Sequence, residues 1–183
     1  MVGYAGGSKE NPIYTSLGNH TETIRIEYDP SVISYKELLD VFWYSHHPAI
    51  PSFSRQYMSI VFYHNEEQLK LAEASRNELK AGTGLEIFTE IIPASDFYLA
   101  EDYHQKYYLQ QLDELADEYL EIYPDIDDFV KSTAVARANG YAGGYGTPDT
   151  LKEEIDKLGL SPNGIAIISD IAAGVIKPAC PVP

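Results

Sequence analysis

One carboxylic acid and two phenols stand next to the segments that the sequence predicts to be strands. Tyr14 ends the run Asn11-Pro12-Ile13-Tyr14, Glu22 follows His20 and Thr21, and Tyr57 ends Ser54-Arg55-Gln56-Tyr57. A carboxyl group among tyrosines can stay protonated through partial burial and then donate a hydrogen bond to a substrate oxygen. Tyrosine hydroxyls are further donors that carry no charge. We therefore expect Glu22, Tyr14 and Tyr57 to form hydrogen bonds with a polar oxygen of a substrate. The alternative is that Glu22 is a solvated carboxylate and that the two tyrosines only pack.

A second group lies in Glu101-Asp102-Tyr103-His104-Gln105-Lys106-Tyr107. His104 and Tyr107 are three residues apart, which places them on one face if this segment is a helix. Both are candidate site residues, and the alternative for His104 is that it only braces its own helix. His20 is expected to order the loop in which it lies.

Cys180, the fourth residue from the end, is the single cysteine of the chain. One cysteine cannot form an internal disulfide, so we expect a reducing compartment and predict a cytoplasmic protein. His46 and His47 are adjacent and not four residues apart, so no helical zinc site is expected. We predict neither a metal nor a bound cofactor.

Composition limits the classes of partner. The 183 residues carry a formal net charge of −15, with 28 acidic residues against 13 lysines and arginines. Binding to nucleic acid or to an anionic membrane requires an excess of basic side chains, so neither is expected. No apolar stretch is long enough to span a bilayer and no secretory signal is evident at the start. We expect a monomer.

The first half of the chain has the pattern of an α+β fold. Residues 1–22 are rich in glycine and are predicted to be a loop; strands are predicted at 23–28, 57–63 and 87–92. Ser34 with Glu37 is a capping-box pattern that begins a helix ending before Pro48, and Asn65 begins a second helix that runs to about Leu79. This order resembles a ferredoxin-like α/β layer missing its first strand and helix.

The second half is predicted to be helical. Helices are expected at about 109–123 and 127–138, and further helices start at Pro148 and Pro162. Between them, residues 140–146 are predicted to be an irregular glycine loop. The pentapeptide Gly-Tyr-Ala-Gly-Gly occurs at 3–7 and again at 140–144, which we interpret as shared loop chemistry. We divide the chain into a core of residues 1–109 and a helical C-terminal extension of residues 110–183, packed on the core, with a mobile tail from about 175.

Several motifs in unbroken order resemble the A type of peptide methionine sulfoxide reductase. They are Val2-Gly3-Tyr4-Ala5-Gly6-Gly7, Asn11-Pro12-Ile13-Tyr14, His20-Thr21-Glu22, the segment from Ile33 to Trp43, Arg55-Gln56-Tyr57 and Ala100-Glu101-Asp102-Tyr103-His104-Gln105. So many motifs in register make the resemblance specific. The remainder, through Asn139-Gly140-Tyr141-Ala142-Gly143-Gly144, is similar to a branch of the family with an extended helical C-terminus.

The resemblance implies reduction of methionine S-sulfoxide, in oxidised proteins or as the free amino acid, as in protein repair under oxidative stress. A cysteine thiolate attacks the sulfoxide sulfur and becomes a sulfenic acid, which a second thiol or a reductant such as thioredoxin restores. Glu22 matches the family's acid at the sulfoxide oxygen, and Tyr14 and Tyr57 match the tyrosines that assist it. His104, Tyr107 and Tyr141 match residues that line the substrate pocket.

The departures from the family concern its sulfur chemistry. The family's nucleophile lies in a Gly-Cys-Phe-Trp-Gly turn ahead of the run that here begins at Val2, and nothing in the 183 residues corresponds to it. Ala142 stands where many members have a resolving cysteine. Cys180-Pro181-Val182 slightly resembles a Cys-Pro-Val ending in which the cysteine is a resolving thiol; the alternative is an incidental terminal cysteine.

We therefore expect a shortened family member with impaired turnover. The first alternative is a non-catalytic protein that binds methionine sulfoxide. The second is a defective gene product with an unpaired sheet edge.

Overall fold

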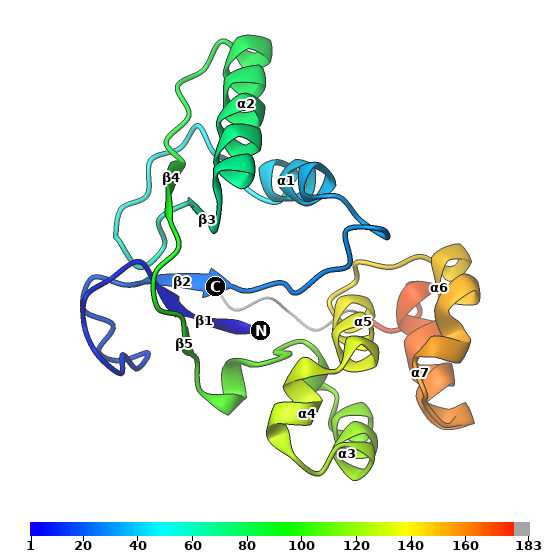
Figure 1. The fold of residues 1–183 in the computed structure, drawn as a ribbon. Coiled ribbons are helices and arrows are strands. Elements are labelled where there is room, and N and C mark those ends of the chain that lie inside the picture. Colours follow the sequence, from blue (N-terminus) through cyan, green and yellow to red (C-terminus); the bar gives the residue numbers. More distant parts are fainter. Residues whose placement is uncertain (178–183) are drawn as a thin grey trace. The chain divides into compact units, whose positions relative to one another are not determined.

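The computed structural model describes residues 1–177 of the chain (Figure 1). The chain divides into two compact units, one of Val2–Ala100 and one from Glu101 onward. The predicted combination of helices and strands is confirmed, and within residues 1–177 all five strands lie in the first unit. The domain boundary near residue 109 and the packing of a helical extension on the core stay predictions.

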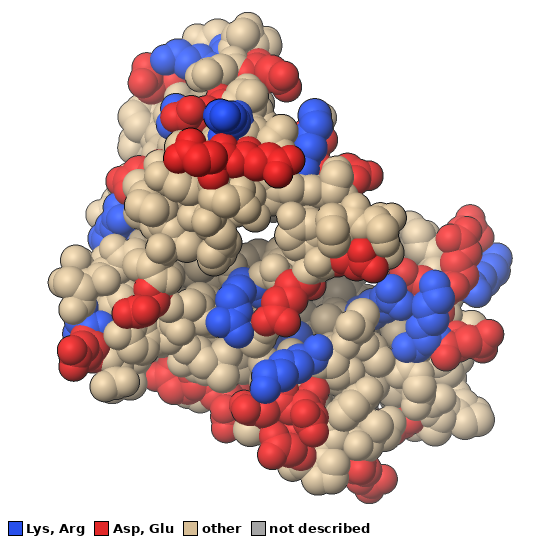
Figure 2. All heavy atoms as spheres, in the orientation of Figure 1, with Lys and Arg blue, Asp and Glu red and all other residues tan. Residues whose placement is uncertain are grey.

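Acidic side chains are scattered over the face drawn in Figure 2, with lysines and arginines between them on a mostly uncharged surface. None of the helices within residues 1–177 combines the length and the apolar character needed to cross a bilayer.

The first unit contains a three-stranded antiparallel sheet in the order β2-β1-β5. Its strands are β1 (Val2–Ala5), β2 (Thr21–Ile24) and β5 (Tyr98–Leu99). The central strand β1 pairs with β2 so that Tyr4 lies opposite Glu22. The pairing of β1 with β2 thereby fixes the position of Glu22 in the sheet.

A two-stranded parallel sheet of β3 (Ile60–Tyr63) and β4 (Glu90–Pro93) completes the strands of this unit. Helices α1 (Tyr35–Tyr44) and α2 (Glu66–Thr83) pack against it. The core between them consists of Leu39, Trp43, Val61 and Ala72. Parallel strands need a crossover connection, and α2 supplies it between β3 and β4.

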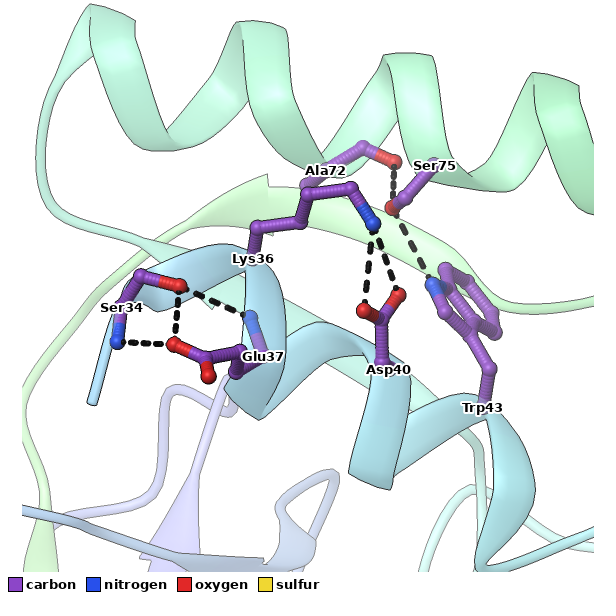
Figure 3. A network of polar contacts seen from close by, with 7 residues as sticks. All are labelled: Ser34, Lys36, Glu37, Asp40, Trp43, Ala72 and Ser75. Carbon is purple, nitrogen blue, oxygen red and sulfur yellow. Dashed lines mark hydrogen bonds and ion pairs between the residues drawn. The ribbon is translucent and has the colours of Figure 1, made fainter.

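The two helices begin where the sequence predicts. Ser34 and Glu37 form a full capping box at α1, and Asn65 accepts a hydrogen bond from the Gln68 N–H at α2. Helix α2 runs beyond the predicted end to Thr83, and the left-handed backbone of Gly84 ends it. Between the helices the Trp43 indole N–H donates to the Ser75 hydroxyl over 3.1 Å (Figure 3), and Trp43 lies in the core.

The second unit is helical. Its α-helices are α3 (Asp113–Ile122), α4 (Ile126–Lys131), α5 (Thr133–Ala142), α6 (Pro148–Glu154) and α7 (Pro162–Ala172), with short 3₁₀ helices before α3 and directly after α6. Their core includes Leu115, Tyr119, Phe129, Val135 and Ile168. Thr147 and Ser161 cap α6 and α7 with Pro148 and Pro162 at the first helical positions, as predicted. The single helix predicted at 127–138 is instead two helices, because Ser132 leaves the helical backbone and caps α5.

The two copies of Gly-Tyr-Ala-Gly-Gly have different structures, so the interpretation as shared loop chemistry was wrong. The first copy begins in β1, in a stretch that was predicted to be a loop, and the second begins inside α5. A side chain at Gly3 would stand 2.3 Å from the carbonyl oxygen of Tyr98 on the neighbouring strand, whereas Gly140 has no neighbour within 4 Å. Tertiary contacts and not the five residues themselves decide each conformation.

Candidate active site

The structure brings the three predicted oxygen-binding residues together. Glu22 lies in β2, and the segment that contains Tyr57 runs beside this strand. The Glu22 N–H donates to the Gln56 carbonyl oxygen over 2.9 Å. The Thr21 hydroxyl donates to the Arg55 carbonyl oxygen over 2.8 Å. These bonds fix residues 55–57 against the strand although more than thirty residues separate them in sequence.

A side-chain network joins the members of this cluster. The Gln56 Nε2 donates to Glu22 Oε1 over 2.7 Å and to the Tyr57 hydroxyl over 3.2 Å. Tyr57 is in turn hydrogen-bonded to the side chain of Tyr14. We call Tyr14, Glu22, Gln56 and Tyr57 the oxygen cluster. The sequence named three of its members; the fourth, Gln56, had as its only signal its place beside Tyr57 in the Arg55-Gln56-Tyr57 motif.

Short-range contacts hold the loop that carries Tyr14. Its turn is closed by a hydrogen bond from the Ser16 N–H to the Ile13 carbonyl oxygen over 2.8 Å. His20 is buried, and its ring nitrogens contact the Gly7 N–H and the Lys9 carbonyl oxygen over 3.2 Å and 2.8 Å. The expectation that His20 orders this loop is confirmed.

The oxygen cluster faces solvent. Glu22 is exposed, and Tyr14 and Tyr57 are 39% and 48% exposed. The partial burial expected for Glu22 is therefore absent. Glu22 pairs with Tyr4 on the short strand β2, and no described element covers its side chain. The pKa of the Tyr57 hydroxyl is raised, first by its hydrogen bond with Tyr14, then by loss of solvent and by the nearby charges of Tyr14 and Glu22.

Two further contacts shape the surroundings of the oxygen cluster. The Arg55 guanidinium donates to Glu90 Oε2 over 2.7 Å, which ties the segment to the start of β4. The Phe53 ring is 89% exposed and lies at a tilt beside the Tyr57 ring, with centroids 5.5 Å apart. The cluster thus offers hydroxyl and carboxyl groups for an oxygen atom next to an apolar aromatic ring.

The other three predicted site residues belong to the helical unit. His104 ends a 3₁₀ helix of Asp102–His104, and the next residues leave the helical path because Lys106 has a φ of 49°. His104 and Tyr107 therefore do not share a helix face, which corrects that prediction. The ring centroids of His104 and Tyr103 are 4.1 Å apart, and those of Tyr107 and Tyr108 are 6.0 Å apart.

Tyr141 lines a small pocket within the helical unit. The pocket has a volume of about 210 Å³ and is lined by Arg137, Gly140, Tyr141, Tyr145, Gly146, Thr150 and Glu154. The buried Tyr141 directs its hydroxyl at Thr150 Oγ1 and Glu154 Oε2, each 3.3 Å away. That Tyr141 lines the substrate pocket stays a prediction.

The predicted thiol, Cys180, lies outside the described residues. Within residues 1–177, no three side chains of the metal-binding types are grouped closely enough to hold an ion.

Comparison with protein families gives two matches. Residues 1–145 match the family described as "Peptide methionine sulfoxide reductase". Residues 125–173 match "Selenoprotein methionine sulfoxide reductase A, helical domain". The first match contains the oxygen cluster, and the second covers helices α4 to α7.

Curated relatives agree with this result. The chain is 44% identical over 163 residues to "Peptide methionine sulfoxide reductase" of Drosophila melanogaster, covering 88% of this chain and 65% of that protein. It is 50% identical over 118 residues to "Peptide methionine sulfoxide reductase MsrA" of Methanosarcina acetivorans, covering 58% of this chain and 63% of that protein. The chain thus spans slightly less than two thirds of the length of these two relatives.

Solved structures lead to the same assignment. "Crystal structure of Mxr1 from Saccharomyces cerevisiae in reduced form" superposes with a TM-score of 0.54 at 32% identity, over 60% of this chain and 68% of that one. "Methionine sulfoxide reductase A of Corynebacterium diphtheriae" does so with a TM-score of 0.50 at 31% identity, over 60% of this chain and 61% of that one. On these matches, together with the ordered motifs, the chain belongs to the peptide methionine sulfoxide reductase family.

Proposed function

We propose that the oxygen cluster binds the oxygen atom of methionine S-sulfoxide and that the protein is a peptide-methionine (S)-S-oxide reductase. The observation that carries this proposal is the hydrogen-bonded grouping of Glu22, Tyr57 and Tyr14. A sulfoxide oxygen is a strong acceptor, and phenolic O–H groups or a protonated carboxyl group are suitable donors to it.

The proposed chemistry is that of the family. A thiolate attacks the sulfoxide sulfur, the oxygen takes up a proton and passes to the attacking sulfur to form a sulfenic acid, and methionine leaves as the sulfide. A second thiol then displaces the sulfenic oxygen, forming a disulfide and releasing water. The oxygen cluster would stabilise the negative charge that grows on the oxygen during the first step. The reaction consumes two thiol equivalents, and no metal or prosthetic group is part of this proposal.

This chain has one cysteine that could be the attacking thiol. Its one cysteine, Cys180, does not stand in a Gly-Cys-Phe-Trp-Gly motif. We therefore expect the 183-residue chain to show little or no reductase turnover by itself.

The test is an assay of the purified chain on a peptide with methionine-S-sulfoxide, with dithiothreitol as reductant. Turnover that matches an intact family member and disappears in Cys180→Ser would contradict this expectation and would assign the attacking thiol to Cys180. Turnover that survives in Cys180→Ser would contradict the requirement for a protein thiol.

A second candidate function is the binding of methionine sulfoxide without turnover. It is favoured by one observation: the oxygen cluster is already assembled by hydrogen bonds within this chain, so a sulfoxide oxygen could bind to it without a reaction. Calorimetric titration with peptides that carry the S-sulfoxide, the R-sulfoxide or unoxidised methionine tests it. Binding of the S-sulfoxide peptide alone, weakened by Glu22→Gln, supports the function, and equal affinity for all three peptides eliminates it.

Partners and location follow from the same proposal. We propose oxidised proteins as the substrate in preference to free methionine sulfoxide, a thioredoxin-like protein as the reductant, and a monomer in the cytoplasm. The exposed position of the oxygen cluster beside Phe53 supports a polypeptide substrate, because it leaves room for chain on either side of the oxidised residue.

A further inference from the structure

We propose that Gln56 is a positioning residue that fixes Glu22 and Tyr57 for their contact with the sulfoxide oxygen. The role in substrate binding rests on the proposed function, whereas the hydrogen bonds of Gln56 do not depend on it. One amide nitrogen of Gln56 bonds both residues, over 2.7 Å to Glu22 Oε1 and 3.2 Å to the Tyr57 hydroxyl.

The orientation of the Gln56 amide follows from the chemistry of its partners. An ionised carboxylate only accepts hydrogen bonds, so the nitrogen and not the oxygen of the amide must face Glu22. The nitrogen carries two hydrogens, and one is directed at each partner. Both N–H groups are thereby used within the oxygen cluster.

The backbone prepares this arrangement. The Glu22 N–H bonds the Gln56 carbonyl oxygen over 2.9 Å, so the same two residues are joined through main chain and side chain. The hydroxyl of Thr21, a residue that is 2% exposed, bonds the Arg55 carbonyl oxygen. The backbone of Gln56 is therefore already fixed, so its side chain loses little conformational freedom when it bonds Glu22 and Tyr57.

The two bonds have different chemical effects. The N–H at Glu22 occupies Oε1, which leaves Oε2 as the oxygen that meets the substrate or its proton. The N–H at Tyr57 occupies an acceptor position of that hydroxyl, so the O–H proton must point elsewhere. In the structure its partner is Tyr14, and in the complex a sulfoxide oxygen would replace or share that partner.

Two variants separate the proposed role from a contribution to folding. Gln56→Leu keeps the approximate size and removes both N–H groups, and Gln56→Glu keeps the shape but presents acceptors to Glu22. Gln111→Leu, at an exposed position of the helical unit, is the matched control. Thermal melting of each variant establishes that it is folded.

The first measurement is the side-chain amide signal of Gln56 in the proton–nitrogen NMR spectrum of the 183-residue chain. We expect the chemical shift of one of its two amide protons to change with pH as Glu22 gains or loses its proton, and Glu22→Gln to abolish this change. A Gln56 signal that stays constant across the titration overturns the proposal. This measurement needs no ligand, so it decides on Gln56 even if the proposed function fails.

The second measurement is the affinity for a methionine-S-sulfoxide peptide by calorimetry. We expect folded Gln56→Leu to bind about tenfold more weakly, which corresponds to about 1.4 kcal/mol, and Gln56→Glu to bind at least as weakly. Gln111→Leu should bind like the unmodified chain. Unchanged affinity in a folded Gln56→Leu overturns the role in substrate binding, whereas absence of binding by the unmodified chain refutes the proposed function itself.

Discussion

Tyr57 interacts with each of the other three members of the oxygen cluster. It bonds Tyr14 and Gln56, and it lies in the field of Glu22. The hydrogen bond with Tyr14 favours the protonated form of Tyr57, and a neighbouring negative charge acts in the same direction. Tyr57 is therefore maintained as a hydrogen-bond donor over a wider pH range than an isolated tyrosine.

Replacing Tyr14 by phenylalanine tests this interaction. We expect the pKa of Tyr57, which lies above the ordinary value near 10, to fall toward that value, because the first cause of the increase is lost. The measurement is an NMR titration of carbon-13-labelled tyrosine, with Tyr57→Phe to assign the signal. Tyr44→Phe changes a 93% exposed tyrosine and should leave the titration unaltered. An ordinary pKa for Tyr57 in the unmodified chain would contradict the interaction.

At the scale of the elements, α1 and α2 are joined by one buried polar contact inside an apolar core. Trp43 from α1 donates to Ser75 of α2, and Ser75 donates in turn to the Ala72 carbonyl oxygen over 3.0 Å (Figure 3). Trp43 is 8% exposed and is the only tryptophan of the chain. The contact satisfies an indole N–H that would otherwise be buried without an acceptor.

A double-mutant cycle measures this contact. We expect Ser75→Ala and Trp43→Phe each to destabilise the first unit, and their coupling free energy to be about 1 kcal/mol, the usual net value of such a bond. Urea unfolding followed by circular dichroism reports all four proteins, since fluorescence is lost in Trp43→Phe. A coupling free energy near zero would show that the two side chains contribute independently.

The helical unit contains a comparable buried contact between elements. Tyr119 of α3 is fully buried, and its hydroxyl donates over 2.8 Å to the carbonyl oxygen of Leu158, which precedes α7. Burial is the first cause that raises the pKa of Tyr119 far above its usual range. Between the ordinary pKa near 10 and the raised one, the folded state keeps a proton that the unfolded state loses.

Stability should therefore fall as the pH rises above about 10, and Tyr119→Phe should remove part of that fall. At pH 7 the same variant should lose about 1–2 kcal/mol, because the carbonyl oxygen of Leu158 loses its donor. Denaturant unfolding at both pH values measures these effects, with Tyr44→Phe as the matched exposed change. An identical alkaline loss in Tyr119→Phe and in the unmodified chain would refute the role of Tyr119.

At the scale of the whole molecule, charge is the dominant property. A net charge of −15 on 183 residues produces repulsion that favours expansion, because 28 acidic residues face only 13 lysines and arginines. The seven ion pairs found within residues 1–177 are mostly exposed and contribute little each. Screening by salt should therefore stabilise this protein.

We expect a cooperative thermal transition whose midpoint rises with sodium chloride between about 10 mM and 300 mM, a range over which the Debye length falls from about 30 Å to below 8 Å. The control is the same series near pH 4.5, the isoelectric point of the sequence, where the rise should be much smaller. A midpoint that is independent of salt at neutral pH would contradict the repulsion, and an insoluble product would favour the interpretation as a defective gene product.

The sequence by itself determined the features that depend on nearby residues. Ser34, Asn65, Thr147 and Ser161 begin helices as predicted, because a cap bonds N–H groups only two or three positions away. The ordered motifs also sufficed to indicate the family. Strand bounds were less accurate: β2 begins two residues before the prediction and β3 three residues after it, since pairing depends on partners elsewhere in the chain.

Only the tertiary structure decided how these pieces combine. Gly-Tyr-Ala-Gly-Gly is a strand followed by a turn at 3–7 and the end of a helix at 140–144, although the five residues are identical. The first copy pairs with Thr21–Ile24 and Tyr98–Leu99, and the second continues a helix that is capped at Ser132. The bond from Gln56 to Glu22 likewise joins residues 34 positions apart. The physical reason is that hydrogen-bond partners supplied from a distance outweigh the weak local preference of a short segment.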